Sequence, residues 1–309
     1  MHAMILTSSS RRAFMAAVPA LVGLSAMPSL ATLPQTLRQS LLILEKNSGG
    51  RLGVFVLDTG TGKGIGWRED ERFGMCSTFK LALAGVILRE GDQGRLNVEE
   101  RIPIRTADVI DHAPIAAPLA GRGDLSLLQL AEATQTTSDN IAANLLLRKL
   151  GGPEEFTARL RALGDSVTRQ DRFEPDANWV PKGEVRDTTT PRAMSALAAK
   201  FLVGDALLPA SREKLLAWTR ATRTGMKRLR AGLPESWQCG DKTGTGRSRG
   251  MPNKHNDIAI CFPPQRAPMV ITAYYDAPGH FDAMRAQDDA VLAKVGELVA
   301  HAVLAEARG

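Results

Sequence analysis

One serine and one lysine are spaced so that they can act as a nucleophile and its base. Ser77 and Lys80 form an S-x-x-K motif, whose hydroxyl and amine lie on one face of a helix. An amine in that position can take the proton of the hydroxyl and so activate it. The motif alone is weak, because a chain of this length contains about one by chance. Ser211 and Lys214 form a second copy, in which we expect Ser211 to cap a helix after Pro209. Its meaning therefore depends on the residues that accompany it.

Two further short motifs follow Ser77 along the chain. Residues 138–140 read S-D-N, and residues 242–244 read K-T-G. Each tripeptide is expected only about 0.1 times by chance in such a chain. The order S-x-x-K, S-D-N, K-T-G is typical of class A β-lactamases and penicillin-binding proteins. The chain therefore resembles this group of serine enzymes.

The resemblance to class A β-lactamases covers about residues 35–305 and includes more than the three motifs. Residues 172–175, which read R-F-E-P, match the omega loop of that family together with Asn178. Asp187 stands where the family has the aspartate that pairs with the arginine of the loop. The composition also predicts a long loop over 169–187, because this stretch is too polar and too rich in proline for a helix or a strand.

The resemblance implies a chemical role for four residues. Ser77 would be the acylated nucleophile, Lys80 and Glu174 would handle its proton, and Ser138 would pass a proton to the departing lactam nitrogen. The family leaves open whether Lys80 or Glu174 accepts the proton in acylation. For deacylation the candidate is Glu174, which would hold the hydrolytic water together with Asn178.

The resemblance also implies a set of binding residues. Arg228 falls where some members carry the arginine that binds the substrate carboxylate. The turn over 247–255 is longer than is usual in the family, so other cations remain candidates for that role: Arg247, Arg249 and Lys254. The complete implied binding set is Asn140, Asn178, Lys242, Thr243, Gly244, Thr245 and Arg228.

Composition argues against metals, cofactors and nucleic acid as partners. The five histidines never fall at the spacing that directs two imidazoles at one ion. Cys76, Cys239 and Cys261 are odd in number and widely spaced, which argues against a disulfide-rich scaffold and a C-x-x-C metal site. The net charge of +6 comes from interspersed charges without a basic run. We therefore expect no metal, no cofactor and no nucleic acid, and small-molecule β-lactams as the ligands.

Residues 1–31 have the features of an export signal. Arg11 and Arg12 precede an apolar stretch over 13–27, and the segment ends in the small-x-small pattern of a cleavage site. The paired arginines favour the twin-arginine pathway, with an ordinary secretory signal as the alternative. The apolar stretch is shorter than the ~20 residues of a spanning helix. The expected location is thus the periplasm, without a permanent membrane anchor.

Hydrophobic periodicity predicts an α/β plus all-α fold. The expected elements are a helix over 33–44, strands over 52–58 and 64–67, a buried helix over 77–90 and helices within 126–221. Three strands follow Trp237, one headed by K-T-G at 242–244 and the others over 258–262 and 269–275, and then a helix over 281–305. Strands at both ends must share one antiparallel sheet, so the helical block is an insertion. We expect an α/β subdomain over 32–68 and 221–309, an all-helical subdomain over 69–220, a site in the cleft between them, and a monomer.

Three functions compete for this set of residues. A serine β-lactamase acting on penicillins and cephalosporins is the leading hypothesis. A D-Ala-D-Ala peptidase or penicillin-binding protein shares the serine, the lysine and K-T-G but typically lacks a deacylating glutamate. A sensor domain that acylates without turnover would normally remain tethered to the membrane. Glu174 and the cleavable signal both favour the β-lactamase.

Overall fold

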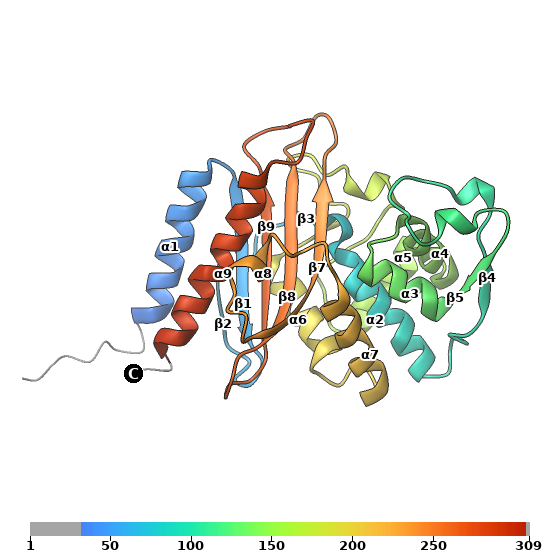
Figure 1. Ribbon diagram of the computed structural model, residues 1–309, viewed down its shortest axis with the longest axis horizontal. Coiled ribbons are helices and arrows are strands. Elements are labelled where there is room, and N and C mark those ends of the chain that lie inside the picture. The colour runs from blue at the N-terminus through green and yellow to red at the C-terminus, as the bar shows by residue number, and fades with distance from the viewer. Residues whose placement is uncertain (1–31, 307–309) are drawn as a thin grey trace, which may run out of the picture.

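The two ends of the described chain lie side by side. A computed structural model describes residues 32–306, so the proposed export signal at 1–31 lies outside the described residues. Helix α1 (Thr32–Ser48) and helix α9 (Ala286–Glu306) pack against each other on one face of a sheet (Figure 1). This arrangement brings the first and last elements of the described chain into one layer.

Five antiparallel strands form the main sheet in the order β2-β1-β9-β8-β7. β1 and β9 pair along their whole length, from Arg51 opposite Asp276 to Asp58 opposite Met269. Because these strands come from opposite ends of the sequence, the sheet closes only when both ends meet. The bounds are β1 (Arg51–Asp58), β2 (Gly64–Trp67), β7 (Gln238–Gly246), β8 (Lys254–Phe262) and β9 (Met269–Asp276).

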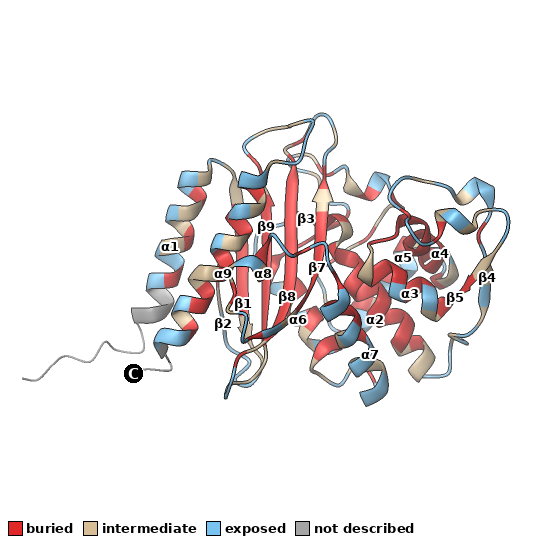
Figure 2. Cartoon of the chain, in the orientation of Figure 1, coloured by how far each residue is buried: buried red, intermediate tan, exposed pale blue. Residues whose placement is uncertain are grey.

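The other face of the sheet packs against a helical layer built around α2 (Phe79–Asp92). Residues 79–88 of this helix are all buried, as its nearly all-round apolar sequence predicts (Figure 2). The surrounding helices share one large hydrophobic core with it. They are α3 (Leu127–Thr136), α4 (Asn140–Leu150), α5 (Pro153–Ala162), α6 (Pro191–Leu202) and α7 (Pro209–Ala221), while the short α8 (Leu229–Gly232) packs against α9.

Two pairs of very short strands were not predicted from the sequence. β3 (Phe73–Gly74) pairs with β6 (Thr188–Thr189), and β4 (Arg101–Pro103) pairs with β5 (Asp124–Ser126). Strands of two or three residues are too short to show a hydrophobic period. The β3–β6 pair matters for the site, because it fixes the chain just before Ser77 against the end of the loop over 169–187.

Three local expectations differ from the structure. The helix expected from residue 77 begins with a 3₁₀ turn, Cys76–Thr78, and becomes α-helical only at Phe79. The last helix begins at Ala286 instead of residue 281. Ser211 is not an N-cap: it lies in the first turn of α7 and donates a hydrogen bond to Asp92 at 2.6 Å. The second S-x-x-K motif therefore ties α7 to the end of α2.

The loop over 169–187 is closed at its base by a buried aspartate. Asp187 accepts hydrogen bonds from the backbone N–H groups of Asp171 and Arg172 at 2.8 and 3.0 Å. The Arg172 guanidinium completes the contact with an ion pair to Asp187 at 2.5 Å. The pairing that the family resemblance implies is thus present, and both ends of the loop are held together.

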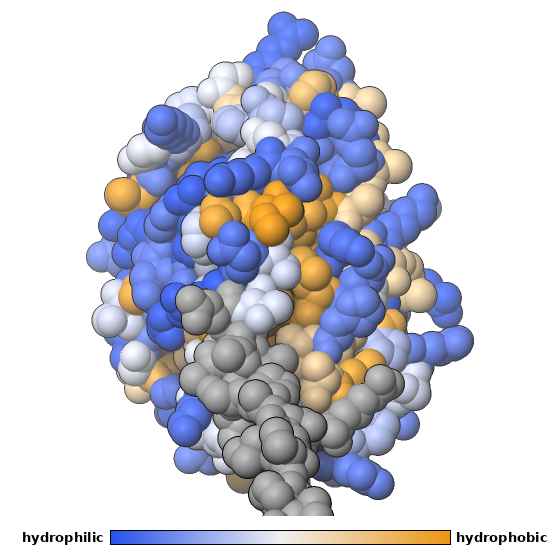
Figure 3. Space-filling view, turned by 90° about the vertical axis from the view of Figure 1, so that its left-hand side faces the viewer, coloured by the Kyte–Doolittle hydropathy of each residue, from blue (hydrophilic) through white to orange (hydrophobic). Residues whose placement is uncertain are grey.

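The surface over α1 and α9 is mainly hydrophilic. Figure 3 looks onto this end of the molecule, where hydrophobic side chains show only in a limited area between polar ones. Within residues 32–306, no helix is both long enough and apolar enough to cross a membrane.

Candidate active site

Ser77 and Lys80 meet at the start of α2. The 3₁₀ turn Cys76–Thr78 presents Ser77, and Lys80 lies fully buried one turn later. The Lys80 Nζ atom donates hydrogen bonds to Ser77 Oγ at 3.0 Å, to the Ser138 carbonyl at 2.9 Å and to Asn140 Oδ1 at 2.5 Å. The side-chain pair that the S-x-x-K spacing predicts is therefore formed, with the amine held by the S-D-N segment.

Glu174 reaches the same serine from the loop over 169–187. Its side chain is buried, with Oε1 at 3.4 Å from Ser77 Oγ and 3.1 Å from Lys80 Nζ. Asn178 donates a hydrogen bond to the other carboxylate oxygen, Oε2. Ser77 thus faces an amine and a carboxylate, both close enough to exchange a proton with it.

Ser138 lies between two lysines. Lys242, fully buried on β7, donates hydrogen bonds to Ser138 Oγ at 3.0 Å and to the Thr243 carbonyl at 2.7 Å. Ser138 itself has a left-handed backbone, with φ of 61°, at the turn that precedes α4. The three sequence motifs therefore converge, and a hydroxyl links their two amines.

Burial lowers the pKa of both lysines. Loss of solvation is the largest cause for Lys80, and the nearby Glu174 carboxylate opposes it. For Lys242, loss of solvation followed by the charge of Lys80 lowers the pKa to about 7. For Lys242, burial and the charge of Lys80 both favour the neutral amine.

Gly244 allows β7 to approach the turn that carries Ser77. A Cβ atom at Gly244 would lie only 2.6 Å from the Met75 carbonyl oxygen. A larger residue at position 244 would therefore collide with the backbone before Ser77, which explains the glycine of K-T-G. Its neighbours are held on the same strand, because Thr243 Oγ1 contacts Thr224 Oγ1 at 2.6 Å and Thr245 Oγ1 accepts a hydrogen bond from Arg228 at 2.8 Å.

Arg228 is buried and held by several partners. Its guanidinium donates to the carbonyls of Gly244 and Asn256 at 2.9 and 2.8 Å, and forms an ion pair with Asp289 at 2.8 Å. His255 contacts the same Asp289 oxygen through Nδ1 at 3.0 Å. The Arg228 head group is therefore fixed at the rim of the site before any ligand arrives.

These side chains surround an open cavity of about 460 Å³. Ser77 lies in its wall, and residues of the S-D-N, omega-loop and K-T-G segments surround it. Its lining is Ser77, His112, Ser138, Asn140, Pro175, Asn178, Thr224, Arg228, Thr243, Thr245, Arg247, Ser248 and Met284. The cavity is large enough to admit a small molecule with a carboxylate beside the serine.

Comparison with known proteins decides the family. The profile described as "Beta-lactamase enzyme family" matches residues 35–303. The chain is 45% identical to Beta-lactamase L2 of Stenotrophomonas maltophilia over 82% of each chain, and 38% identical to Beta-lactamase Toho-1 of Escherichia coli over 96% of this chain and 99% of that one. The chain belongs to the class A β-lactamase family.

Solved structures agree with this assignment. A β-lactamase of Xanthomonas campestris has a TM-score of 0.82 and 47% identity, covering 88% of this chain and 98% of its own. The structure described as "Ancestral (GNCA) Beta-lactamase class A" has a TM-score of 0.81 and 51% identity, covering 86% of this chain and 99% of its own. The chain is accordingly a serine β-lactamase that hydrolyses β-lactams, with the expected fold.

Among the alternative cations, the structure separates Arg247 from Lys254. Arg247 lies on the cavity of the β-lactamase and donates to the Asp282 carbonyl at 2.8 Å. Lys254 is buried elsewhere and forms an ion pair with Asp276 at 2.7 Å. Arg249 does not line the Ser77 cavity either, and its carbonyl accepts a hydrogen bond from the Trp179 ring. Only Arg228 and Arg247 of the four candidates lie beside Ser77.

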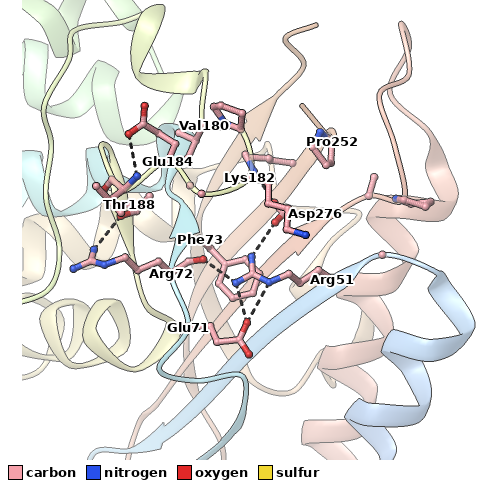
Figure 4. Close-up of a pocket in the computed structure, with 18 of the residues that line it drawn as sticks. Arg51, Glu71, Arg72, Phe73, Val180, Lys182, Glu184, Thr188, Pro252 and Asp276 are labelled. Atoms are coloured by element: carbon pink, nitrogen blue, oxygen red, sulfur yellow. Dashed lines mark hydrogen bonds and ion pairs between the residues drawn. The ribbon is translucent and has the colours of Figure 1, made fainter. Parts of the chain in front are cut away.

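A second cavity, of about 650 Å³, lies behind the omega loop (Figure 4). Its charged groups are largely paired with one another. Arg51 contacts Glu71 at 3.0 Å and Asp276 at 3.1 Å, and Lys254 pairs with Asp276. Of the residues considered for the site from the sequence, only Lys254 lines this cavity. The two cavities share no lining residue, although residues of the loop over 169–187 line each of them.

Sequence analysis missed the residue that anchors Glu174. Asn144 on α4 donates to the Glu174 carbonyl at 2.8 Å and accepts from the Glu174 N–H at 2.9 Å. The available signal was position: Asn144 lies four residues after Asn140 and is the one polar residue within the apolar stretch Ile141–Leu147. Asp139 was also missed as a brace. It caps α4 through Ala142 and accepts two further backbone N–H groups from residues 115 and 116.

Proposed function

We propose that this β-lactamase hydrolyses penicillins and cephalosporins through an ester on Ser77. One observation carries the proposal: Ser77 Oγ lies within 3.4 Å of both Lys80 Nζ and Glu174 Oε1 at the wall of an open cavity. Proton transfer to one of these groups creates the alkoxide that attacks the lactam carbonyl. Glu174 and Asn178 then hold and activate the water that cleaves the ester.

Ser138 and the binding residues complete the proposed cycle. Ser138 passes a proton to the lactam nitrogen, supported by its contacts with Lys80 and Lys242. Arg228 and Lys242 attract the substrate carboxylate, because both place a positive charge on the same side of the cavity. The binding residues proposed beside them are Asn140, Thr243, Gly244 and Thr245. No step of this cycle requires a metal or a cofactor.

Steady-state hydrolysis of a small β-lactam panel tests the substrate range. We expect the purified chain to turn over both a penicillin and a cephalosporin. The loss of absorbance of the lactam ring measures this turnover. A D-Ala-D-Ala dipeptide ester serves as the contrasting substrate, since a peptidase would cleave it. A protein that becomes acylated by the penicillin but releases no product would contradict the proposal.

The pH dependence of substrate capture should report on Lys242. Its pKa of about 7 means that the positive charge is present at lower pH and is lost as pH rises through that value. The value of kcat/KM for a penicillin should therefore fall above pH ~7, by up to about tenfold per pH unit. Lys242→Arg should flatten this decline, because a guanidinium stays charged. An unchanged alkaline decline in Lys242→Arg would assign it to another group.

We also propose export to the periplasm through the twin-arginine pathway, and action as a monomer. The paired arginines support the export route. Replacing Arg11 and Arg12 together with lysine should leave the precursor in the cytoplasm, because the two cations are not interchangeable in such recognition. Cell fractionation measures this. Full periplasmic activity of the double variant would indicate an ordinary secretory signal.

A further inference from the structure

Two cysteines far apart in the sequence face each other across β7 and β8. Cys239 and Cys261 are directly opposite in the register of these antiparallel strands. Opposite residues point to the same face, with Cα atoms about 4.5 or 5.5 Å apart according to the type of pair. A disulfide joins Cα atoms separated by about 4.4 to 6.8 Å. Both types of pair therefore lie within the range that a disulfide spans.

The two thiols differ in exposure and contact each other. Both are free, with Cys261 fully buried and Cys239 half-buried. Burial, followed by a hydrogen bond with the Cys239 thiol, raises the pKa of Cys261 well above its usual value. A small oxidant can thus reach Cys239 first, and the buried Cys261 lies beside it as the second thiol to react.

The third cysteine cannot take part in this pair. Cys76 lies against Gly246, where a Cβ atom would be 2.9 Å from its sulfur. Gly246 and Cys239 are at opposite ends of β7, which corresponds to a separation of roughly 20 Å or more at the rise of a β-strand. The odd number of cysteines is explained if one remains free and two combine.

We propose that Cys239 and Cys261 form a cross-strand disulfide that fastens β7 to β8. The oxidant is a low-molecular-weight disulfide. The Cys239 thiolate attacks it, forms a mixed disulfide and releases one small thiolate. Cys261 then loses its proton, attacks the Cys239 sulfur and releases the second small thiol. Two protein thiols are oxidised to one disulfide, and one small disulfide is reduced to two thiols.

The position of this bond gives it a role in holding the active-site strand. In the order of the main sheet, β7 is an edge strand whose one neighbour is β8. β7 carries Lys242, three residues after Cys239, and the strand continues to Gly246 beside the Ser77 turn. A covalent link at Cys239 would therefore secure the free edge that presents K-T-G.

Thiol counting by intact-protein mass spectrometry tests the proposal. The full chain is incubated with oxidised glutathione, unfolded in guanidinium with N-ethylmaleimide, and weighed. Reduced protein should carry three maleimide labels, and oxidised protein one. Cys239→Ser should carry two labels before and after oxidation, whereas Cys261→Ser should change from two labels to one label and one glutathione on Cys239, because no second thiol resolves the mixed disulfide. Cys76→Ser, the matched control, should fall from two labels to none.

Thermal unfolding provides a second measurement on the same samples. The disulfide closes a loop of roughly 20 residues, and oxidation should raise the Tm of the wild-type enzyme by about 5 °C. Cys239→Ser should show no such rise. Closure should also accelerate with pH, because the second step needs the Cys261 thiolate.

The possible results separate clearly. A single label in oxidised wild-type protein, together with no label in oxidised Cys76→Ser, supports the bond. Three labels on the wild-type protein after prolonged oxidation at pH 9 would overturn it, as would a disulfide-linked wild-type dimer or a stable glutathione adduct on Cys239 of the wild-type protein. These results are independent of β-lactam turnover, so a failure here leaves the proposed catalytic cycle untouched.

Discussion

Replacing Glu174 with alanine is expected to leave the enzyme trapped as an ester on Ser77. The carboxylate is buried and accepts a hydrogen bond from Asn178, while Asn144 holds the Glu174 backbone, next to the position at which water must attack. General-base assistance contributes about 10² to 10⁴-fold, so deacylation should slow by that factor and limit turnover. Intact-protein mass spectrometry after mixing with a penicillin should show an adduct of the whole drug mass, because ring opening expels nothing.

Two companion variants make this result specific. Ser77→Ala should never form the adduct, since the nucleophile is gone. Glu184→Ala removes another carboxylate of the same loop, one that pairs with Arg186 at 2.5 Å, and should retain turnover. Wild-type turnover by Glu174→Ala, without an accumulating adduct, would contradict the assignment of the deacylating base.

The grouping of the candidate site residues was predictable because it follows from short local patterns. The spacing of Ser77 and Lys80 alone places the amine beside the hydroxyl, and the structure gives 3.0 Å for that contact. The loop over 169–187 was also predictable, because proline and polar residues exclude regular structure there. The antiparallel sheet followed from strands at both ends of the sequence.

The remaining features depend on contacts between distant segments. Asn144 holds Glu174 only because α4 and the omega loop meet in the fold. Cys239 and Cys261 face each other only through the register of β7 and β8. The low pKa of Lys242 arises mainly from burial, which a sequence does not reveal. Local spacing thus predicts which groups react, whereas packing decides how they are held and charged.

Arg228 illustrates the same division at a single residue. Its place in the sequence suggested a cation free to meet the substrate carboxylate. In the structure its guanidinium already contacts Thr245, two carbonyl oxygens and Asp289. The partners keep the head group from moving, so a carboxylate at the rim would meet a cation that is already positioned.

Removing Lys80 should slow acylation, in contrast to the deacylation defect of Glu174→Ala. The Lys80 amine lies 3.0 Å from Ser77 Oγ, closer than the Glu174 carboxylate at 3.4 Å. Burial lowers the pKa of Lys80, which favours the neutral amine that can accept a proton. We expect Lys80→Ala to reduce the rate of acylation by about 10² to 10⁴-fold. The measurement is the pre-steady-state burst with a chromogenic cephalosporin.

Lys80→Arg separates the base from the charge. A guanidinium keeps the positive charge near Glu174 but does not lose its proton at neutral pH, so it cannot serve as the base. Acylation should therefore be as slow in Lys80→Arg as in Lys80→Ala. Glu174→Ala provides the complementary test of acylation. Its acyl-enzyme can form quickly only if Lys80 accepts the Ser77 proton without the help of the carboxylate. Fast acylation by Lys80→Arg, with slow acylation by Glu174→Ala, would transfer the acylation role to the carboxylate.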